Sequence, residues 1–405
     1  GTTAIIPNLL LWDGSTIVID PKGANAIVTA KRRRAMGQNV HILDPFNIVE
    51  SEAEKASFNP LDWIDPTAPN IREQINIIAE ALVVPDPQQK EKHWDDGAKT
   101  VIAGMIAQLI TDPKFENPNL TMLRDMISAM PESQAELWAD MSLNQGAGRL
   151  AMDAGNRIIR GIGTNEMSSI LSNADKHTEW LSSPAIAKTI SHSTFNFSEL
   201  KDQPTTVYLI LPPEYLETHN RFLRLIVNYM ISQMSVGGKA KVPVLLMMDE
   251  FLALGRMTEV EKAFGLMAGY NLVLWPFVQD YGRLQDLYGK SVNAFVANSR
   301  AVQVFGISDE ESKEFVSKYI GDRSHKNGGK NFLQRQIVKL RTTTEVSIDI
   351  AAETNMQYIL RAGKAPLYIE KVKYYDSAPI KSLRGLGGIT NGKFHGLYDK
   401  DPDFA

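Results

Sequence analysis

Short apolar runs alternate with amphipathic segments near both ends of the chain, and this alternation restricts the possible folds more than any other feature. The runs occupy residues 15–20, 39–46, 206–211, 244–250, 271–279 and 301–306. A chain that returns to a strand through a helix forms parallel pairs. Parallel strands are buried on both faces, so they read as continuous apolar runs. The pattern therefore predicts an α/β fold with a parallel sheet covered by helices on both faces.

The segment from about 66 to 198 has a different texture. Its apolar residues recur at i, i+3, i+4 and i+7, as in REQINIIAEALVV, which is the period of amphipathic helices. We therefore predict the first part of an α/β domain at 1–65, an all-α insert at 66–198, and the remainder of the α/β domain at 199–405. The last part is expected to contain a hairpin that turns at Gly363–Lys364, and a Gly-rich surface tail.

Composition and charge exclude several classes of site. The 405 residues include no cysteine, and the seven histidines lack H-E-x-x-H spacing, so thiol chemistry and a catalytic zinc site are not expected. Residues 61–200 contain 19 Asp and Glu against 11 Lys and Arg, while the rest contains 28 against 32. An acidic insert in a mildly basic body is consistent with two modules. The chain lacks the strong excess of basic residues that most nucleic-acid-binding domains have.

The strongest single motif is the apolar run Val244–Met248, followed directly by Asp249 and Glu250. Strands of α/β folds bind ligands at their carboxyl edge, and adjacent buried carboxylates are costly unless a cation or hydrogen bonds compensate them. Nucleotide hydrolases use this Walker B pattern, in which the Asp helps to hold Mg²⁺ and the Glu directs water. The alternative interpretation is a strand that ends in a solvated acidic turn.

Two further candidates follow other predicted strands. Gln279 ends the run after the acidic pair, where it would sense a γ-phosphate or position water, although Gln is also an ordinary turn residue. Asp20 and Lys22 follow the first run in the turn Asp-Pro-Lys-Gly, where the lysine would reach a phosphate or pair with a carboxylate. The motif G-x-x-x-x-G-K-[ST] is absent from the 405 residues, so they do not contain the phosphate cradle of a P-loop enzyme.

Seven segments, in this order, join these observations: IIPNLLLWDGSTIVIDPKG, NVHILDPFN, FNPLDWI, HWDDGAK, LLMMDEFLALGRM, AGYNLVLWPFVQ and LQDLYG. Together they resemble the TraG/TraD-type coupling proteins of type IV secretion and bacterial conjugation, from Gly1 to about Tyr375. The resemblance implies a RecA-like P-loop NTPase sheet with an all-α domain inserted early. It also implies ATP and Mg²⁺ as cofactors.

Residue by residue, the resemblance places Mg²⁺ coordination on Asp249 and water activation on Glu250. Gln279 would be the sensor, and Asp20 and Lys22 would support the nucleotide edge.

The family's P-loop Gly-Lys immediately precedes the helix that leads to I-P-N-L-L. Gly1 is therefore expected directly after that lysine, with Thr2 and Thr3 near phosphate at the N-terminus of the first helix. On this interpretation the chain is the cytosolic body of a longer protein whose anchoring helices lie upstream, at the cytoplasmic side of the bacterial inner membrane.

The sequence departs from the family pattern at two positions. The usual acidic residue after D-P-K-G is Ala24, so any contact that it makes is lost. Some relatives have an Arg before A-G-Y-N where this chain has Leu266. An arginine finger, which stabilises charge in phosphoryl transfer, must then come from elsewhere, and Arg256 and Arg300 are the candidates. Arg256 is equally consistent with a structural salt bridge.

The resemblance implies an ATPase, homo-hexameric in the full-length protein, that brings relaxase–DNA or effector substrates, recruited through the all-α domain, to subunits of the secretion channel. Two alternatives stay open: a docking adaptor in which ATP turnover is secondary, and a hexameric DNA pump of the FtsK or helicase type. The densest basic cluster, Lys31–Arg34, lies at the C-terminus of a predicted helix, where cations favour the helix dipole. DNA binding is therefore expected to be weak and salt-sensitive.

Overall fold

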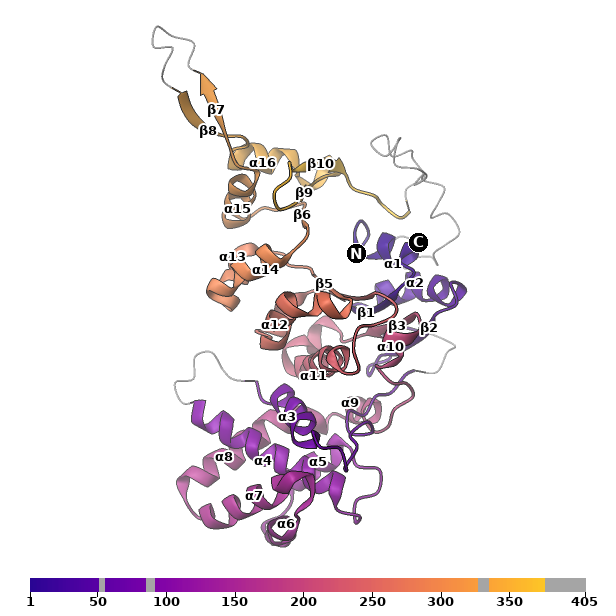
Figure 1. The fold of residues 1–405 in the computed structure, drawn as a ribbon, viewed down its shortest axis with the longest axis vertical. Coiled ribbons are helices and arrows are strands. Elements are labelled where there is room, and N and C mark those ends of the chain that lie inside the picture. Colours follow the sequence, from indigo (N-terminus) through magenta and orange to yellow (C-terminus); the bar gives the residue numbers. More distant parts are fainter. Residues whose placement is uncertain (51–54, 85–91, 327–334, 376–405) are drawn as a thin grey trace.

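The computed structural model describes residues 1–50, 55–84, 92–326 and 335–375. The predicted surface tail lies outside these residues. Figure 1 shows a helical region at one end, the parallel sheet in the middle, and small β elements at the other end. None of the helices within the described ranges is long and apolar enough to cross a membrane.

A five-stranded sheet forms the centre of the chain, in the order β2-β3-β1-β4-β5, with every neighbouring pair parallel. Its strands are β1 Ser15–Ile19, β2 Asn39–Leu43, β3 Thr205–Leu209, β4 Val244–Met248 and β5 Leu272–Pro276. All residues of the three inner strands are buried, as continuous apolar runs predict. The prediction of a parallel α/β sheet is confirmed.

Helices cover both faces of this sheet because alternate strand residues point to opposite sides. The covering helices are α1 Ile5–Leu11, α2 Ala24–Ala35 and α11 Leu216–Ser235. α1 and α2 pack in one apolar cluster with Val18 and Met247. Ile17 and Leu246, one residue earlier in each strand, belong instead to the large core that contains α11.

The basic cluster Lys31–Arg34 includes one residue with a clear structural role. Arg33 is fully buried, and its guanidinium donates to the carbonyls of Leu9 at 3.1 Å, Gly14 at 2.8 Å and Trp12, and to Thr206 Oγ1 at 2.9 Å. These carbonyls lie in α1 and the turn after it, where no helical partner is available. Arg33 therefore fixes the entry to β1.

All strand or helix structure in the described residues between β2 and β3 is helical. The helices are α3 Ile71–Leu82, α4 Lys92–Thr111, α5 Leu120–Ser128, α6 Pro131–Leu143, α7 Gly146–Gly161, α8 Asn165–Thr178, η1 Glu179–Ser182, α9 Pro184–Thr189 and α10 Glu199–Asp202. α4 is the central helix of this group, and many of its residues are fully buried. α4 and α7 pack so closely that a Cβ on Gly104 would overlap Ala154.

Short helices and two small β structures follow the parallel sheet. The helices are η3 Phe251–Leu254, α12 Thr258–Leu266, α13 Tyr281–Tyr288, α14 Val292–Asn298, α15 Glu310–Ile320 and α16 Thr343–Asp349, and the strands are β6 Val302–Val304, β7 Asp322–Lys326, β8 Arg335–Lys339, β9 Met356–Leu360 and β10 Leu367–Glu370. β9 and β10 form the predicted hairpin. β6 was expected to join the parallel sheet, and that prediction is wrong. β6 pairs antiparallel with β9 instead, which satisfies its backbone groups in a separate three-stranded sheet.

Candidate functional site

Three strands of the parallel sheet end level with one another. The register pairs Ile19 with Met248, and Met248 with Pro276. The polar residues that follow these strands therefore emerge at one edge of the sheet, where α/β folds bind ligands. Asp20 follows β1, the pair Asp249–Glu250 follows β4, and Gln279 comes three residues after β5.

Glu250 and Gln279 are in direct contact at this edge. Gln279 Nε2 donates to Glu250 Oε1 at 2.7 Å and to Oε2 at 2.8 Å. Glu250 adopts a left-handed backbone conformation, with φ at 57°, which costs a non-glycine residue roughly 1–2 kcal/mol. The turn is held by the amide of Phe251, which donates to the carbonyl of Phe277 at 3.2 Å. Strain of this kind is concentrated at functional sites.

Asp20 is buried and contacts the start of α2. Its carboxylate accepts from the Ala26 amide at 2.8 Å and from Asn25 Nδ2 at 3.1 Å. Burial raises the pKa of Asp20 to about 7, with a smaller contribution from the negative charge of Asp249, although the two hydrogen bonds act in the opposite direction. Lys22 is exposed, and no described residue forms an ion pair with it.

A cavity of about 540 Å³ opens beside this edge. Gly1, Asp249, Glu250 and Gln279 all contribute to its wall, together with residues of β5 and β6. Thr2 and Thr3 do not line it. The structure thus brings Gly1 to the acidic pair and Gln279, whereas it leaves Lys22 on the surface.

The acidic residues at the edge fit a magnesium ion that is held jointly with a nucleotide. No group of three His, Asp or Glu residues in the described part of the chain forms a preassembled metal cage. Mg²⁺ typically retains several waters and is bound through one or two carboxylates plus substrate phosphates. Asp249 supplies such a carboxylate, and Asp20 lies close enough for Asp249 to raise its pKa.

The two arginine candidates differ in their surroundings. The Arg256 guanidinium forms an ion pair with Glu261 of α12 at 3.3 Å. Arg300 is exposed and has no hydrogen bond or ion pair with any other described residue.

Sequence reasoning missed Arg224, which holds the turn directly after Glu250. Arg224 lies on α11 and is buried. Its Nη1 donates to the carbonyls of Leu254 at 2.6 Å and Arg256 at 2.9 Å. Burial lowers the pKa of this guanidinium to about 10. The available signal was an arginine within the apolar stretch Phe222–Ile226, because a cation there requires buried partners.

A second buried polar group joins the helical region to α11. His177 of α8 and Asp95 of α4 are both buried, and His177 Nε2 lies 3.2 Å from Asp95 Oδ1. Arg221 of α11 also contacts His177: its Nη2 lies 3.3 Å from His177 Nδ1. Burial lowers the pKa of His177, and the hydrogen bond to Asp95 opposes this shift.

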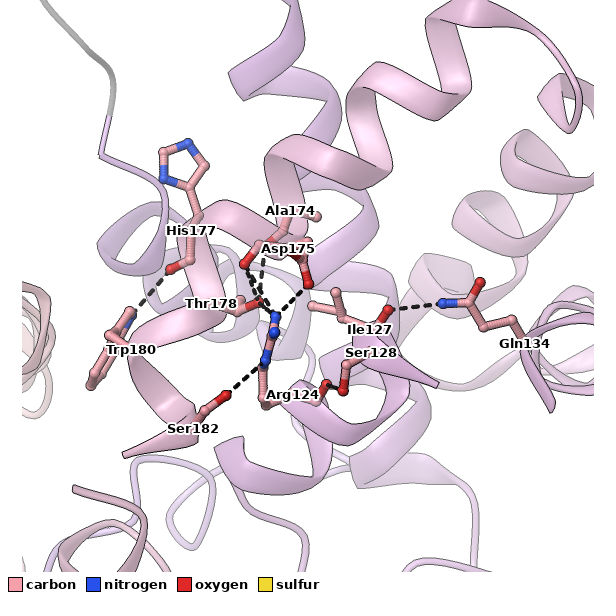
Figure 2. Close-up of polar contacts among 10 residues, drawn as sticks. All are labelled: Arg124, Ile127, Ser128, Gln134, Ala174, Asp175, His177, Thr178, Trp180 and Ser182. Carbon is pink, nitrogen blue, oxygen red and sulfur yellow. Dashed lines mark hydrogen bonds and ion pairs between the residues drawn. The ribbon is translucent and has the colours of Figure 1, made fainter. Parts of the chain in front are cut away.

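Figure 2 shows the surroundings of His177 at the end of α8. Trp180 Nε1 donates to the His177 carbonyl at 3.1 Å. Arg124 of α5 donates to Asp175 Oδ1 at 2.6 Å and to Ser182 Oγ at 3.0 Å. α5, α8 and η1 are thus held together where α8 contacts α11.

Comparison with known proteins identifies the family. The profile of the family described as "Type IV secretory system Conjugative DNA transfer" matches residues 1–386. The chain belongs to this family. It is 26% identical to VirD4 of Rhizobium radiobacter over 411 residues, covering 96% of this chain and 57% of the relative. It is 24% identical to the conjugal transfer protein TraG of Agrobacterium fabrum over 328 residues, covering 79% and 49%. The chain therefore spans about half the length of these relatives.

Solved structures of the plasmid coupling protein TrwB have the same fold. An unbound form lacking its first 70 residues superposes with a TM-score of 0.70 at 15% identity, covering 92% of this chain and 83% of that truncated chain. TrwB in complex with ADP and Mg²⁺ gives 0.69 at 14% identity, covering 90% and 80%. This likeness confirms the predicted fold class, and the family match confirms the resemblance stated from the sequence.

Proposed function

We propose that this chain is the cytosolic body of an ATPase that couples ATP hydrolysis to delivery of substrates to a type IV secretion channel. The observation that carries the proposal is the contact of Gln279 with Glu250, beside Asp249, at the carboxyl edge of the sheet. Phosphoryl transfer mainly requires positioning and charge neutralisation. Magnesium bound to ATP supplies that neutralisation, and Asp249 would hold it.

In this proposal Glu250 orients the attacking water, and Gln279 fixes the Glu250 carboxylate and senses the γ-phosphate. Gly1 lines the same cavity as the acidic pair. Thr2 and Thr3 would lie near the phosphates, and Asp20 and Lys22 would support the nucleotide edge. The finger arginine comes from a neighbouring subunit of a hexamer. Arg300 is favoured over Arg256, because Arg256 is already paired with Glu261.

The test is ATP hydrolysis, compared between the wild type and the Glu250→Gln variant. We expect turnover to fall by at least about 100-fold, while Mg²⁺–ATP binding is retained. Glu259→Gln is the matched control, because Glu259 pairs with Lys262 on the exposed side of α12. Equal turnover in the Glu250→Gln variant and the wild type would refute the assignment. Separate Arg256→Ala and Arg300→Ala variants then identify the finger.

We also propose that residues 66–198 form an inserted all-α domain that recruits relaxase or effector proteins. Its excess of acidic residues favours basic partner segments. A shallow groove between α4 and α8, with Trp94, Ser172 and Lys176 among its lining residues, is the proposed contact surface. Ser172→Arg should weaken capture of a relaxase by the 405-residue chain. Ser191→Arg, on the exposed turn after α9, is the control and should leave capture unchanged.

A further inference from the structure

The loop that follows β4, residues 250–257, is anchored on two sides by side chains of other helices, and we call it the Glu250 loop. On one side, Arg224 of α11 donates to the carbonyls of Leu254 and Arg256. On the other side, Tyr288, the last residue of α13, lies buried against the loop. The final carbonyls of a short helix such as η3 lack partners within that helix, so these side chains fix where the loop lies.

The Tyr288 hydroxyl contacts the Glu250 loop as both acceptor and donor, which a phenol can do at once. It accepts from the Met257 amide at 3.1 Å and donates to the Gly255 carbonyl at 3.5 Å. Burial raises the pKa of Tyr288 to about 12, so the hydroxyl keeps its proton at neutral pH. The ring stacks on Phe251 of the same loop, with the centroids 5.7 Å apart. Ring and hydroxyl therefore contact opposite ends of the loop.

The Glu250 loop contains two residues with left-handed backbones, Glu250 with φ at 57° and Gly255 with φ at 68°. Strain of this kind persists only where the surrounding structure over-determines it. The amide of Phe251 fixes the start of the loop through the Phe277 carbonyl, and the side chains from α11 and α13 fix its end. Without the contacts at its end, the loop can relax towards an ordinary conformation, and the Glu250 carboxylate moves with it.

α13 connects the end of this loop to Gln279. The helix begins after Gln279 and Asp280, and the Asp280 side chain caps it. Gln279 contacts the Glu250 carboxylate, whereas Tyr288, at the other end of the helix, contacts the backbone of the same loop. An eight-residue helix is about 12 Å long and moves as a unit. A shift of Gln279 therefore reaches both ends of the Glu250 loop.

We propose that Tyr288 is a positioning residue for ATP hydrolysis, which holds the Glu250 loop so that the Glu250 carboxylate stays aimed at the attacking water. This inference rests on the proposed ATPase function. Tyr288 does not line the cavity beside Glu250, so it acts through the loop and not on the nucleotide. A misplacement of about 1 Å at a reacting group can cost roughly 100-fold in rate. Loss of the hydroxyl should accordingly lower kcat and leave nucleotide binding intact.

The test variant is Tyr288→Phe, which keeps the ring on Phe251 and removes only the hydroxyl. We expect kcat for ATP hydrolysis to fall at least about tenfold, with KM for ATP within about twofold of the wild type. In a Glu250→Gln background the same substitution should cause no further loss of turnover, because Tyr288 acts through Glu250. A residue with a merely structural role would lower turnover in both backgrounds.

The matched control is Tyr358→Phe. Tyr358 is also buried, and its hydroxyl donates to Asp349 in the cluster of the small β sheet, away from the cavity. This control should keep the turnover of the wild type. Wild-type kcat in Tyr288→Phe, an equal loss in Tyr358→Phe, or a further loss in the Glu250→Gln background would overturn the proposal.

Amide hydrogen exchange without nucleotide tests the anchoring of the loop separately from ATP hydrolysis. In Tyr288→Phe the Met257 amide loses its acceptor, so the amides of Phe251 and Met257 should exchange about 3- to 10-fold faster. The amides of β4 should keep their wild-type rates. Unchanged exchange at both loop amides also overturns the proposal. If the wild type hydrolyses no ATP, the proposed function fails, and the exchange result alone decides whether Tyr288 fixes the loop.

Discussion

Replacing Asp20 with Asn should change how the stability of the chain depends on pH. The pKa of Asp20 is 3.8 in the unfolded chain and about 7 in the folded chain. A raised carboxyl pKa means that the folded state holds a proton that the unfolded state has released. Stability from this group is therefore fully present below about pH 4 and is lost as pH rises towards 7. Each pH unit in this window costs about 1.4 kcal/mol.

Between pH 5 and pH 8 the free energy of unfolding of the wild type should fall by about 2–3 kcal/mol relative to that of Asp20→Asn. All other groups titrate equally in both proteins, so their contributions cancel in this comparison. Asn keeps a carbonyl oxygen for the Ala26 amide, so the hydrogen bond that starts α2 is retained. Urea unfolding of both proteins at the two pH values measures the difference, with the m-value as a check on two-state behaviour.

The control for this experiment is Asp65→Asn. Asp65 is exposed, and hydrogen bonds from Thr67 lower its pKa. Stability from a lowered carboxyl pKa is lost only in acid, below the unfolded value of 3.8. The difference in free energy of unfolding between this variant and the wild type should therefore not change between pH 5 and 8. If the difference in free energy of unfolding between Asp20→Asn and the wild type is also constant over this range, Asp20 is not a buried carboxyl group that retains its proton.

Three further predictions concern packing and strain. Gly104→Ala should destabilise the chain by about 1–3 kcal/mol, measured by urea unfolding, because the new methyl overlaps Ala154 between α4 and α7. Arg224→Met should cost about 2–3 kcal/mol, because it removes the donor to the buried carbonyl of Leu254 and to the carbonyl of Arg256. A loss below about 0.5 kcal/mol would contradict this role. Glu250→Asn should raise the thermal midpoint by relieving about 1 kcal/mol of left-handed strain, whereas Glu250→Gln should not.

The edge of the sheet could be predicted because its signals are local. Each strand is a continuous apolar run, and a polar residue directly after a parallel strand must lie at the carboxyl edge. Asp249, Glu250 and Gln279 therefore lie where the sequence predicted, and their catalytic roles remain predictions. The left-handed backbone of Glu250 was not predictable, because nothing in the residue type requires it. It depends on the bond from Phe251 to Phe277, a residue of the neighbouring segment.

Non-local pairing explains what the sequence left undetermined. The run at 301–306 is apolar, as a parallel strand is, and only the presence of β9 decides that it pairs elsewhere.

α11 links the helical region between β2 and β3 to the edge of the sheet. Arg221 and Arg224 are three positions apart, so they lie on the same side of the helix, separated by about 4.5 Å of rise. Arg221 contacts His177 of α8, and Arg224 binds the carbonyls of the turn that follows Glu250. Removing one partner of a buried charged group typically costs several kcal/mol. A displacement of α8 must therefore either move α11, and with it the turn at Glu250, or break the part-buried contact between Arg221 and His177.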